Sequence, residues 1–461
     1  MAAAALTTAA AVPFGAAAEV VPNPVISRGC PAYSGVNPAT AVSGNDEHYF
    51  SFAFLTAPDY LAYDLSEVPE EERKQIIAVW YNTSSYDKLG QYVNANMEPT
   101  DYTVEVNAAP GGAYPEDGWV VVDKVEGATY SSRQHLIDFE GYNWIRLNVS
   151  KADGKTGSQA QVNFDIHNVS EGVSDSWIFF GDSITAMSMN NCYGTGFATH
   201  VNEIDSRYFP IQENGGIGGI TSTDGKENID RWLSFSPAKY VSIAYGTNDC
   251  WGNPDNTETY YQNTKYMIDA VLAAGKVPVL GKIPASTNES VGPNVPLYNA
   301  KVEQLWEEYG DKLVKGPDLE AFFNEHPEYL SDGDGVHPSS EGQDAMRKLW
   351  AETMYERVYT ADSPQQPTTE PTTESGSGDI LWGDANEDSQ VNLNDAVAIL
   401  QHVALEQKYG LSEQGRLNAD VVDNGKSGVN GMDALAIMML DSKLITEKNF
   451  PLTSEQMSEI R

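Results

Sequence analysis

Two short blocks of the sequence hold the side chains of a serine nucleophile and its base. The block GDSIT directly follows an apolar run, so Ser183 would lie at the carboxyl end of a strand. A serine hydroxyl becomes nucleophilic when a base takes its proton, and histidine suits that role. Further along the chain, the block DGVHP holds His337, and Asp334 can fold back to the second nitrogen of the ring. The spacing therefore predicts Ser183 as nucleophile, His337 as general acid/base and Asp334 as its orienting partner, with Asp332 as a less well-spaced rival.

Two further blocks carry hydrogen-bond donors that suit an oxyanion. Residues 214–219, NGGIGG, follow a predicted strand, and residues 246–249, GTND, follow the apolar run 240–245. Donors aimed at the charge that develops during acyl transfer contribute roughly 3 kcal/mol each. Each block alone is equally compatible with an ordinary turn or a helix cap. The four blocks in this order are more specific than any one of them.

In order and context, the four blocks resemble the SGNH (GDSL-like) hydrolase family over about residues 176–355. The resemblance implies an esterase that forms an acyl-serine intermediate and uses no metal in its chemistry. It also implies an oxyanion hole made of the backbone N–H groups of Ser183 and Gly219 and the side-chain amide of Asn248. Six neighbouring residues are candidates for an acyl or sugar pocket, although core packing or loop structure explains each of them equally well: Asn190, Asn191, Tyr193, Thr221, Tyr245 and Trp251.

The elements that must position these blocks indicate a doubly wound, flavodoxin-like α/β domain over residues 173–360. Apolar runs alternate with glycine-containing turns and longer helical segments, which is typical of a buried parallel sheet. Loops gather at the carboxyl ends of such strands, where the blocks fall. The predicted strands are 177–180, 240–245 and 277–280, and the predicted helices are 258–274 and 297–309, ending at Gly275 and Gly310.

Residues 19–172 alternate apolar and polar side chains over short runs, which predicts an antiparallel β-sandwich. Three segments, ISRGCPA at 26–32, LAYDL at 61–65 and YNWIRL at 142–147, loosely resemble a galactose-binding-like jelly roll. Two functions are compatible with this domain. Its Trp and Tyr side chains could stack on sugar rings, or they could fill the sandwich core while the domain supports the hydrolase.

A segment rich in Pro, Thr, Ser and Gly, residues 361–378, predicts a solvated linker. Beyond it, residues 379–461 begin with a loop whose oxygen-bearing side chains are spaced like calcium ligands and precede an apolar helix. Ser389 replaces the turn glycine of an EF-hand, and the Asp at the last position resembles a dockerin loop. The ligands predicted for this first loop are Asp384, Asn386, Asp388, Gln390, Asn392 and Asp395.

The second half of this C-terminal module repeats the same frame with a loop two residues longer than the standard one. An acidic turn before a helix explains this second loop as well as a metal site does; its candidate ligands are Asp420, Asp423, Asn424, Asn430 and Asp433. The dockerin resemblance implies Ca²⁺-dependent binding to a cohesin of a scaffoldin. It places the contacts around Leu393, Asn394, Val397, Gly431 and Met432.

The composition excludes some partners and bears on the compartment. With 28 Lys+Arg against 66 Asp+Glu, the net charge of −38 disfavours nucleic acid and anionic membranes, and no apolar stretch has the ~20 residues of a membrane helix. Residues 1–18 resemble the apolar region and cleavage site of a secretory signal, so we expect export, although no Lys or Arg forms a basic region in this segment. Of three cysteines, Cys192 and Cys250 lie close to the site blocks and are the better pair for a disulfide.

These features predict a secreted, extracellular, cellulosome-associated carbohydrate esterase. Its expected substrate is an acetylated plant cell-wall polysaccharide such as xylan, mannan or pectin, from which it removes O-acetyl groups. The ester chemistry follows from the four blocks, whereas the carbohydrate substrate follows from the dockerin resemblance. A lipase-like or thioester hydrolase of the same family is an alternative, and so is a non-catalytic carbohydrate-binding protein with a degenerate hydrolase domain.

Overall fold

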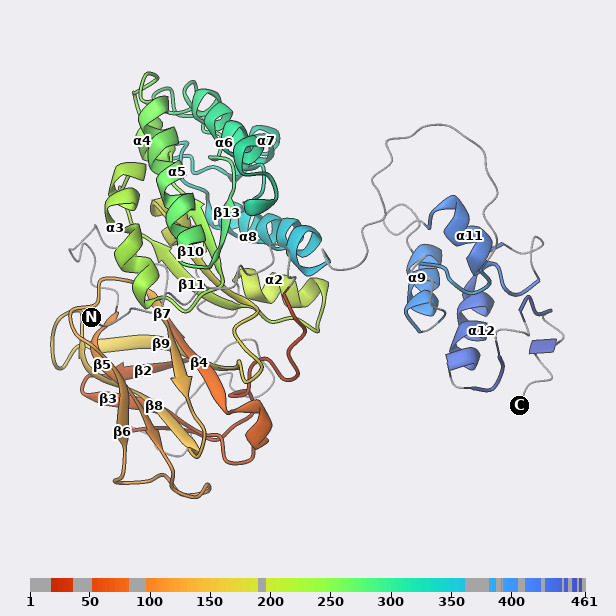
Figure 1. The fold of residues 1–461 in the computed structure, drawn as a ribbon, viewed down its shortest axis with the longest axis horizontal. Helices are drawn as coiled ribbons and strands as arrows, with labels where there is room; N and C mark the ends of the chain where they lie inside the picture. Colours follow the sequence, from red (N-terminus) through yellow and green to blue (C-terminus); the bar gives the residue numbers. More distant parts are fainter. Residues whose placement is uncertain are drawn as a thin grey trace, which may run out of the picture. The chain divides into compact units, whose positions relative to one another are not determined.

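The computed structural model describes residues 18–35, 52–82, 97–189, 196–360, 381–386, 391, 393–404, 411–423, 428–441, 443–446, 450–453 and 456–457. They belong to two compact units, one within residues 1–366 and one within residues 367–461 (Figure 1). The predicted linker, residues 361–378, lies outside the described residues. Among the helices described, none combines the length and the apolar character needed to cross a bilayer.

Antiparallel sheets make up the N-terminal part of the first unit, as the alternation predicted. Leu61, Val104 and Leu147 of one sheet share a fully buried core with Ala78 and Phe164 of the other. The first sheet has the strand order β1 (Ala32–Ser34), β3 (Asp59–Asp64), β8 (Trp144–Ala152), β5 (Pro99–Asn107) and β6 (Val120–Val125), and the second has the order β2 (Phe52–Thr56), β9 (Gln159–Asn168), β4 (Gln75–Tyr81) and β7 (Ser132–Asp138).

A parallel sheet with helices around it forms the rest of the first unit, which confirms the doubly wound prediction (Figure 1). The strand order is β11 (Ile211–Gly216), β10 (Ser176–Gly181), β12 (Tyr240–Ala244), β13 (Val277–Leu280) and β14 (Val314–Lys315). This order is that of a flavodoxin-like sheet. The helices are α1 (Ser183–Ser188), α2 (Phe197–Ile204), α3 (Ser222–Phe235), α4 (Thr247–Cys250), α5 (Thr257–Ala273), α6 (Val295–Tyr309), α7 (Leu319–Glu325) and α8 (Ser340–Met354), followed by a π-helical turn (Tyr355–Tyr359).

Several predicted boundaries differ from the observed ones. Asn214 and Gly216, which we expected to follow a strand, are themselves in β11 and pair with Phe179 and Gly181 of β10. Backbone pairing sets the strand end here, and the glycines conceal it in the sequence. The two predicted helices begin at Thr257 and Val295, one and two residues early. Gly275 and Gly310 stop them as predicted, with φ values of 71° and 51°.

Two glycines allow α1 to lie tightly against the sheet. A Cβ on Gly181 would come within 2.1 Å of Thr185 Oγ1, and one on Gly216 within 2.2 Å of the Ala186 nitrogen. Contacts this short do not occur between real atoms, so any side chain at either position would push α1 away from β10 and β11. The two glycines thereby set how closely α1, the helix that begins with Ser183, packs against β10 and β11.

The sandwich contacts the parallel sheet at the edge strand β11. The Ser132 hydroxyl of β7 accepts a hydrogen bond from the Asn214 N–H at 2.6 Å and donates to the Asn214 carbonyl at 3.3 Å. The Gln134 side chain donates to the Trp177 carbonyl at 2.8 Å and accepts from the Ser176 hydroxyl at 2.5 Å. Side chains of β7 therefore satisfy the open backbone groups of Asn214 on the edge strand β11 and also bind the first two residues of its neighbour β10.

The second unit contains α9 (Leu393–Ala404), α11 (Glu413–Ala419) and α12 (Gly431–Asp441). Ala396 and Ile399 of α9 share a buried core with Ala434 and Ile437 of α12. The same apolar pattern follows each of the two acidic loops of the sequence, so the internal repeat predicts both helices.

One buried carboxyl group gives the first unit a testable pH dependence. Asp175 accepts hydrogen bonds from the Tyr359 hydroxyl at 2.7 Å and the Trp177 indole at 2.9 Å. Burial nevertheless raises the pKa of Asp175 from 3.8 to about 6. The folded state therefore holds this proton more tightly than the unfolded chain, and the contribution of Asp175 to the free energy of unfolding falls as pH rises from 4 to 6.

Asp175→Asn keeps the acceptor oxygen and removes the titration. Between pH 4 and pH 7 we expect the stability of this variant to gain on the order of 3 kcal/mol relative to the parent. Urea unfolding at both pH values measures the difference, with the exposed Asp138→Asn as control. Parallel stability profiles for Asp175→Asn and the parent would contradict the assignment.

Candidate active site

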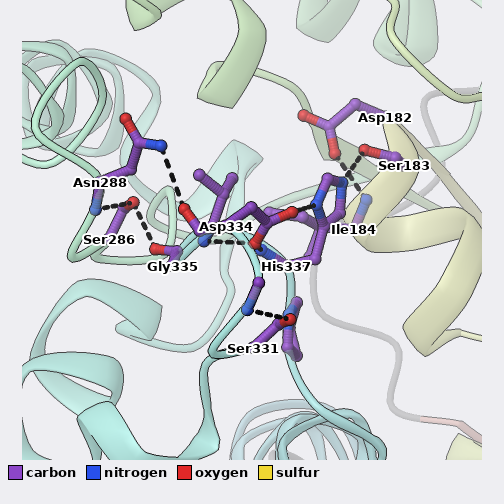
Figure 2. A network of polar contacts seen from close by, with 12 residues as sticks. Asp182, Ser183, Ile184, Ser286, Asn288, Ser331, Asp334, Gly335 and His337 are labelled. Carbon is purple, nitrogen blue, oxygen red and sulfur yellow. Dashed lines mark hydrogen bonds and ion pairs between the residues drawn. The ribbon is translucent and has the colours of Figure 1, made fainter.

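Ser183 is the first residue of α1, directly after β10. The preceding Asp182 caps the helix, and its carboxylate accepts a hydrogen bond from the Ile184 N–H at 3.0 Å. Ser183 Oγ lies 2.7 Å from His337 Nε2, and His337 Nδ1 lies 2.6 Å from Asp334 Oδ2 (Figure 2). The structure therefore brings the three predicted residues together in one chain of hydrogen bonds, the arrangement by which a serine hydroxyl is activated.

The Asp334 carboxylate is held by its own loop as well as by His337. Its second oxygen accepts hydrogen bonds from the Val336 N–H at 2.9 Å and the His337 N–H at 3.0 Å. Partial burial raises the pKa of Asp334, but these donors and the His337 ring outweigh it, so the pKa lies below its ordinary value. An ionised Asp334 keeps the proton of His337 on Nδ1 and leaves Nε2 to accept from Ser183. Of the two predicted candidates, Asp334 rather than Asp332 makes this contact.

A segment after β13 that no sequence motif marks fixes the loop that carries Asp334. The Asn288 side chain donates to the Asp334 carbonyl at 3.0 Å, and the Ser286 hydroxyl donates to the Gly335 carbonyl at 2.6 Å (Figure 2). Gly335 has a φ of 66°, and a Cβ there would lie 2.3 Å from Thr287 Oγ1. The available signal was position: this polar segment follows a strand of the parallel sheet, as the other blocks do.

Of the three predicted oxyanion donors, the Ser183 N–H is at the start of α1, Gly219 lies in the loop before α3, and Asn248 lies in α4. Gly219 is exposed, with a φ of 74°, and a Cβ there would meet no atom within 4 Å. The glycine therefore provides a left-handed backbone conformation. The Asn248 side chain donates to the Ile220 carbonyl at 2.8 Å, which ties it to the segment that holds Gly219. An amide has two N–H groups, so Asn248 can make this bond and still donate a second one to an oxyanion.

Two buried carboxyl groups near the site, those of Asp182 and Asp249, have pKa values above the ordinary one for aspartate. Burial raises the pKa of Asp182 to about 7 and also raises the pKa of Asp249. Asp249 accepts hydrogen bonds from the Ser222 N–H at 2.9 Å and from the Ser222 hydroxyl, which links α4 to α3. Partial protonation of Asp182 near neutral pH reduces the negative charge next to the place where an oxyanion would form.

The structure places three of the six predicted pocket residues and one cysteine of the predicted disulfide. Thr221 forms a capping box with Asp224 at the start of α3, and Tyr245 is buried in the core, whereas Trp251 is 45% exposed. Cys250 is a free, buried thiol that donates to the Thr247 carbonyl, so the predicted bridge is not present at this residue. Four of the residues concerned lie outside the described residues: Asn190, Asn191, Cys192 and Tyr193.

The two acidic loops of the second unit share one backbone pattern. Asp395 accepts a hydrogen bond from the Asn386 N–H at 3.1 Å, and Asp433 accepts one from the Val422 N–H at 2.8 Å. Burial and the charge of Asp420 raise the pKa of Asp433. Adjacent buried carboxyl groups are the donor type that Ca²⁺ prefers, and the ion would offset their repulsion.

Part of each predicted ligand set can be placed. Asp384 and Asp395 are buried in the first loop, and Asp420 and Asp433 in the second, while Asn386, Asp423 and Asn430 are also described. Within the described ranges, no group of three or more His, Cys, Asp or Glu side chains is arranged to hold a metal ion. The other predicted ligands lie outside those ranges: Asp388, Gln390, Asn392 and Asn424.

The Asn288 hydrogen bond gives a test of how the Asp334 loop is positioned. We expect Asn288→Ala to lower kcat for a small acetyl ester roughly 10-fold, since slight misplacement of reacting groups can cost up to ~100-fold. KM and the melting temperature should change little, because the side chain bonds only to two loop backbones, donating to the Asp334 carbonyl and accepting from the nearby Ser290 N–H at 2.9 Å. Asn202→Ala is the control, as Asn202 also ties a loop through backbone carbonyls, those of Ser206 and Tyr208. Equal losses of kcat in both variants would contradict the role.

Known proteins resemble parts of this chain. A "Multidomain esterase" of Ruminococcus flavefaciens is 26% identical over 52% of this chain and 33% of its own length, and a "Xylanase/beta-glucanase" of the same organism is 36% identical over 19% of this chain and 12% of its own. The chain thus spans a third or less of these relatives. The solved structure of a catalytic mutant of an acetylxylan esterase from Geobacillus stearothermophilus is 23% identical, with 41% of this chain and 95% of that one covered and a TM-score of 0.33.

A family model matches the part of the chain that holds all four blocks. The matched family is the GDSL-like Lipase/Acylhydrolase family, and the match covers residues 179–345. This range includes Ser183, Gly219, Asn248, Asp334 and His337. The chain therefore contains a hydrolase domain of the GDSL-like lipase/acylhydrolase family.

Proposed function

We propose that this protein is a secreted carbohydrate esterase that removes O-acetyl groups from plant cell-wall polysaccharide. The observation that carries the proposal is the chain of hydrogen bonds from Ser183 through His337 to Asp334, with distances of 2.7 and 2.6 Å. Without these two hydrogen bonds, Ser183 would have no base to activate it, and the domain could bind a substrate but not hydrolyse it. Their presence therefore favours an enzyme over a degenerate, non-catalytic hydrolase domain.

The proposed reaction uses each of these groups in turn. Ser183 Oγ bonds to the acetyl carbonyl carbon as its proton passes to His337 Nε2. The N–H groups of Ser183, Gly219 and Asn248 stabilise the oxyanion. The intermediate then expels the sugar oxygen, which takes the proton from the imidazolium, and leaves acetyl-Ser183. Water attacks the acetyl group as His337 takes its proton, and acetate leaves as the proton returns to Ser183.

Two observations favour a short acyl group on a polysaccharide. Ser183 is 8% exposed, so little of its surface is open to a substrate, which suits a small acyl group. The two relatives reported above are called a multidomain esterase and a xylanase/beta-glucanase, and the C-terminal module resembles a dockerin. An enzyme attached to a plant-wall-degrading complex would meet acetylated xylan, mannan or pectin.

The second unit is proposed as a Ca²⁺-dependent docking module for a cohesin. Val397, Leu400 and Val403 are 46%, 42% and 48% exposed on α9 and recur every three residues, so they lie along one face of the helix. Met432 and Leu435 are exposed on α12 in the corresponding part of the repeat. Such apolar side chains on a small helical unit suit a protein partner. Of the predicted contacts, the side chains of Leu393 and Asn394 lie outside the described ones.

Acetate release from acetylated xylan, mannan and pectin tests the enzymatic proposal. We expect release from at least one of the three, and a loss of roughly 10⁴-fold or more in Ser183→Ala because the nucleophile is removed. Ser188→Ala, in the same helix, is the matched control and should retain activity. Nitrophenyl esters of increasing acyl length separate the alternatives, since a lipase-like enzyme would prefer the longer chains. Activity unchanged in Ser183→Ala would rule out this site.

Chelation of Ca²⁺ tests the docking proposal. The ion would be held by the buried carboxylates of the two loops, so we expect EGTA to abolish binding to immobilised cohesin and to lower the thermal unfolding transition of the second unit. Hydrolysis of a nitrophenyl acetate should be unchanged, because no proposed ligand lies in the hydrolase domain. Asp395→Ala should weaken cohesin binding in the same way, and excess Ca²⁺ should restore it after chelation. Loss of esterase activity on chelation would contradict the separation of the two sites.

A further inference from the structure

We propose that a cavity between the β-sandwich and the parallel sheet binds a saccharide that bears a uronate group. This junction cavity, of about 590 Å³, lies between residues 124–133 of the sandwich, strand β11 and helix α3. Its volume is within the range of small-ligand sites. Ser183, Gly219, Asn248, Asp334 and His337 are not among its lining residues. It is therefore a separate site, and the inference rests on the proposed polysaccharide substrate.

Two arginines without a carboxylate partner line the junction cavity. Arg133 donates to the Tyr130 hydroxyl at 3.1 Å, and its Nε is buried with no hydrogen-bond partner. Arg231 is exposed and donates to the Asn228 side chain at 3.1 Å. Neither forms a salt bridge with any residue that the structure describes, whereas Arg146 pairs with Glu105, and Arg207 with Asp205. A planar guanidinium of this kind suits a ligand carboxylate, which it can bind through two parallel hydrogen bonds.

The acidic residues of the cavity do not cancel this charge. Glu126 pairs with Lys124 at 2.8 Å, so these two groups offset each other. Glu213 is 4% exposed, and burial raises its pKa to about 7, even though Arg133, Lys276 and the Gln134 N–H favour its ionised form. At pH 7 and below, a large share of Glu213 is therefore a neutral group that can donate a hydrogen bond to a ligand oxygen. The two unpaired arginines leave the cavity positively charged.

The remaining lining suits a sugar ring. The half-buried rings of Phe235 of α3 and Tyr130 of the sandwich line the cavity, with the buried Trp232 behind them, and the Arg133 guanidinium lies 3.9 Å above the Phe235 ring. Sugars present apolar C–H faces as well as hydroxyls, so aromatic rings beside planar polar side chains match them. A simple inorganic anion would use the arginines but not the rings. The combination therefore favours an acidic sugar over phosphate or sulfate.

The junction cavity adjoins the candidate active site along the chain. Ile217 lines it and lies two residues before Gly219, and Phe180 lines it three residues before Ser183. The proposal therefore requires a polysaccharide long enough to extend from the cavity, past the carboxyl ends of β10 and β11, to Ser183. The cavity would give the esterase a preference for acidic polymers such as pectin or glucuronoxylan.

Binding measured without turnover tests this proposal. In full-length Ser183→Ala, we expect trigalacturonate or a glucuronate-substituted xylotetraose to bind at least 10-fold more tightly than neutral xylotetraose by isothermal titration calorimetry. Sodium chloride should weaken the uronate complexes, since exposed charge pairs are screened by salt. Arg231→Ala and Arg133→Gln, each added to Ser183→Ala, should lose about 10-fold in affinity. Arg207→Ala, an exposed arginine outside the cavity, is the control and should lose none.

The outcomes separate this inference from the proposed function. Equal affinity for neutral and uronate-bearing oligosaccharides, or an affinity that Arg231→Ala leaves unchanged, would overturn it, and Arg231 is exposed enough for this variant to fold. Inorganic phosphate competing as well as galacturonate would also overturn it, because that ligand would not need the aromatic rings. Uronate binding without any acetate release in the wild type would sustain the cavity while the esterase proposal failed. Acetate release without uronate binding would do the reverse.

Discussion

The candidate site depends on one hydrogen bond, that between Ser183 Oγ and His337 Nε2, which joins residues 154 positions apart. A serine hydroxyl alone is a poor nucleophile, and the bond exists only if the two residues are delivered to the same place with little freedom. The parallel sheet makes this possible, because the carboxyl ends of its strands meet at one edge. The first three blocks come at the ends of β10, β11 and β12, the segment of Ser286 and Asn288 follows β13, and the block of His337 follows β14.

The support behind that bond comes from both sides. On the serine side, Gly181 and Gly216 let α1 lie against the sheet, and Ser132 of the sandwich holds the backbone of Asn214, whose side chain donates to the Ala186 carbonyl of α1 at 2.8 Å. On the histidine side, Asn288 and Ser286 hold the loop of Asp334. The sandwich thus helps to position the nucleophile, whatever else it binds. These contacts are a physical basis for the supporting role, one of the two functions that the sequence allowed for the sandwich.

The parts of the site that the sequence predicts are those with a local cause. A serine after a strand, a histidine three residues from an aspartate and a glycine at a positive φ can each be read from a few consecutive residues. The Asn288 contact and the junction cavity are formed by segments far apart in the chain, and no local pattern encodes them. The disulfide prediction fails at Cys250, whose thiol is free, because closeness to the site blocks in sequence is not enough to form a bridge. Strand β11 was misplaced because Gly215 and Gly216 look like a turn until their pairing with β10 is known.

Charge distribution, rather than total charge, decides what this protein can bind. A net charge of −38 predicts repulsion of anions at long range, but salt screens that field beyond roughly 8 Å at physiological ionic strength. At shorter range the groups in contact with a ligand dominate. Among the described residues of the first unit, Arg28, Arg146, Arg207 and Arg347 form ion pairs with carboxylates, and Arg73 and Arg357 donate to backbone carbonyls. Arg133 and Arg231 do neither and lie in one cavity with a partly protonated Glu213, so they form a local exception to the acidic surface. This protein has few Lys and Arg side chains, and most charged groups on its surface are acidic. Two arginines without a carboxylate partner in one cavity are therefore stronger evidence for an anion site than they would be in a basic protein.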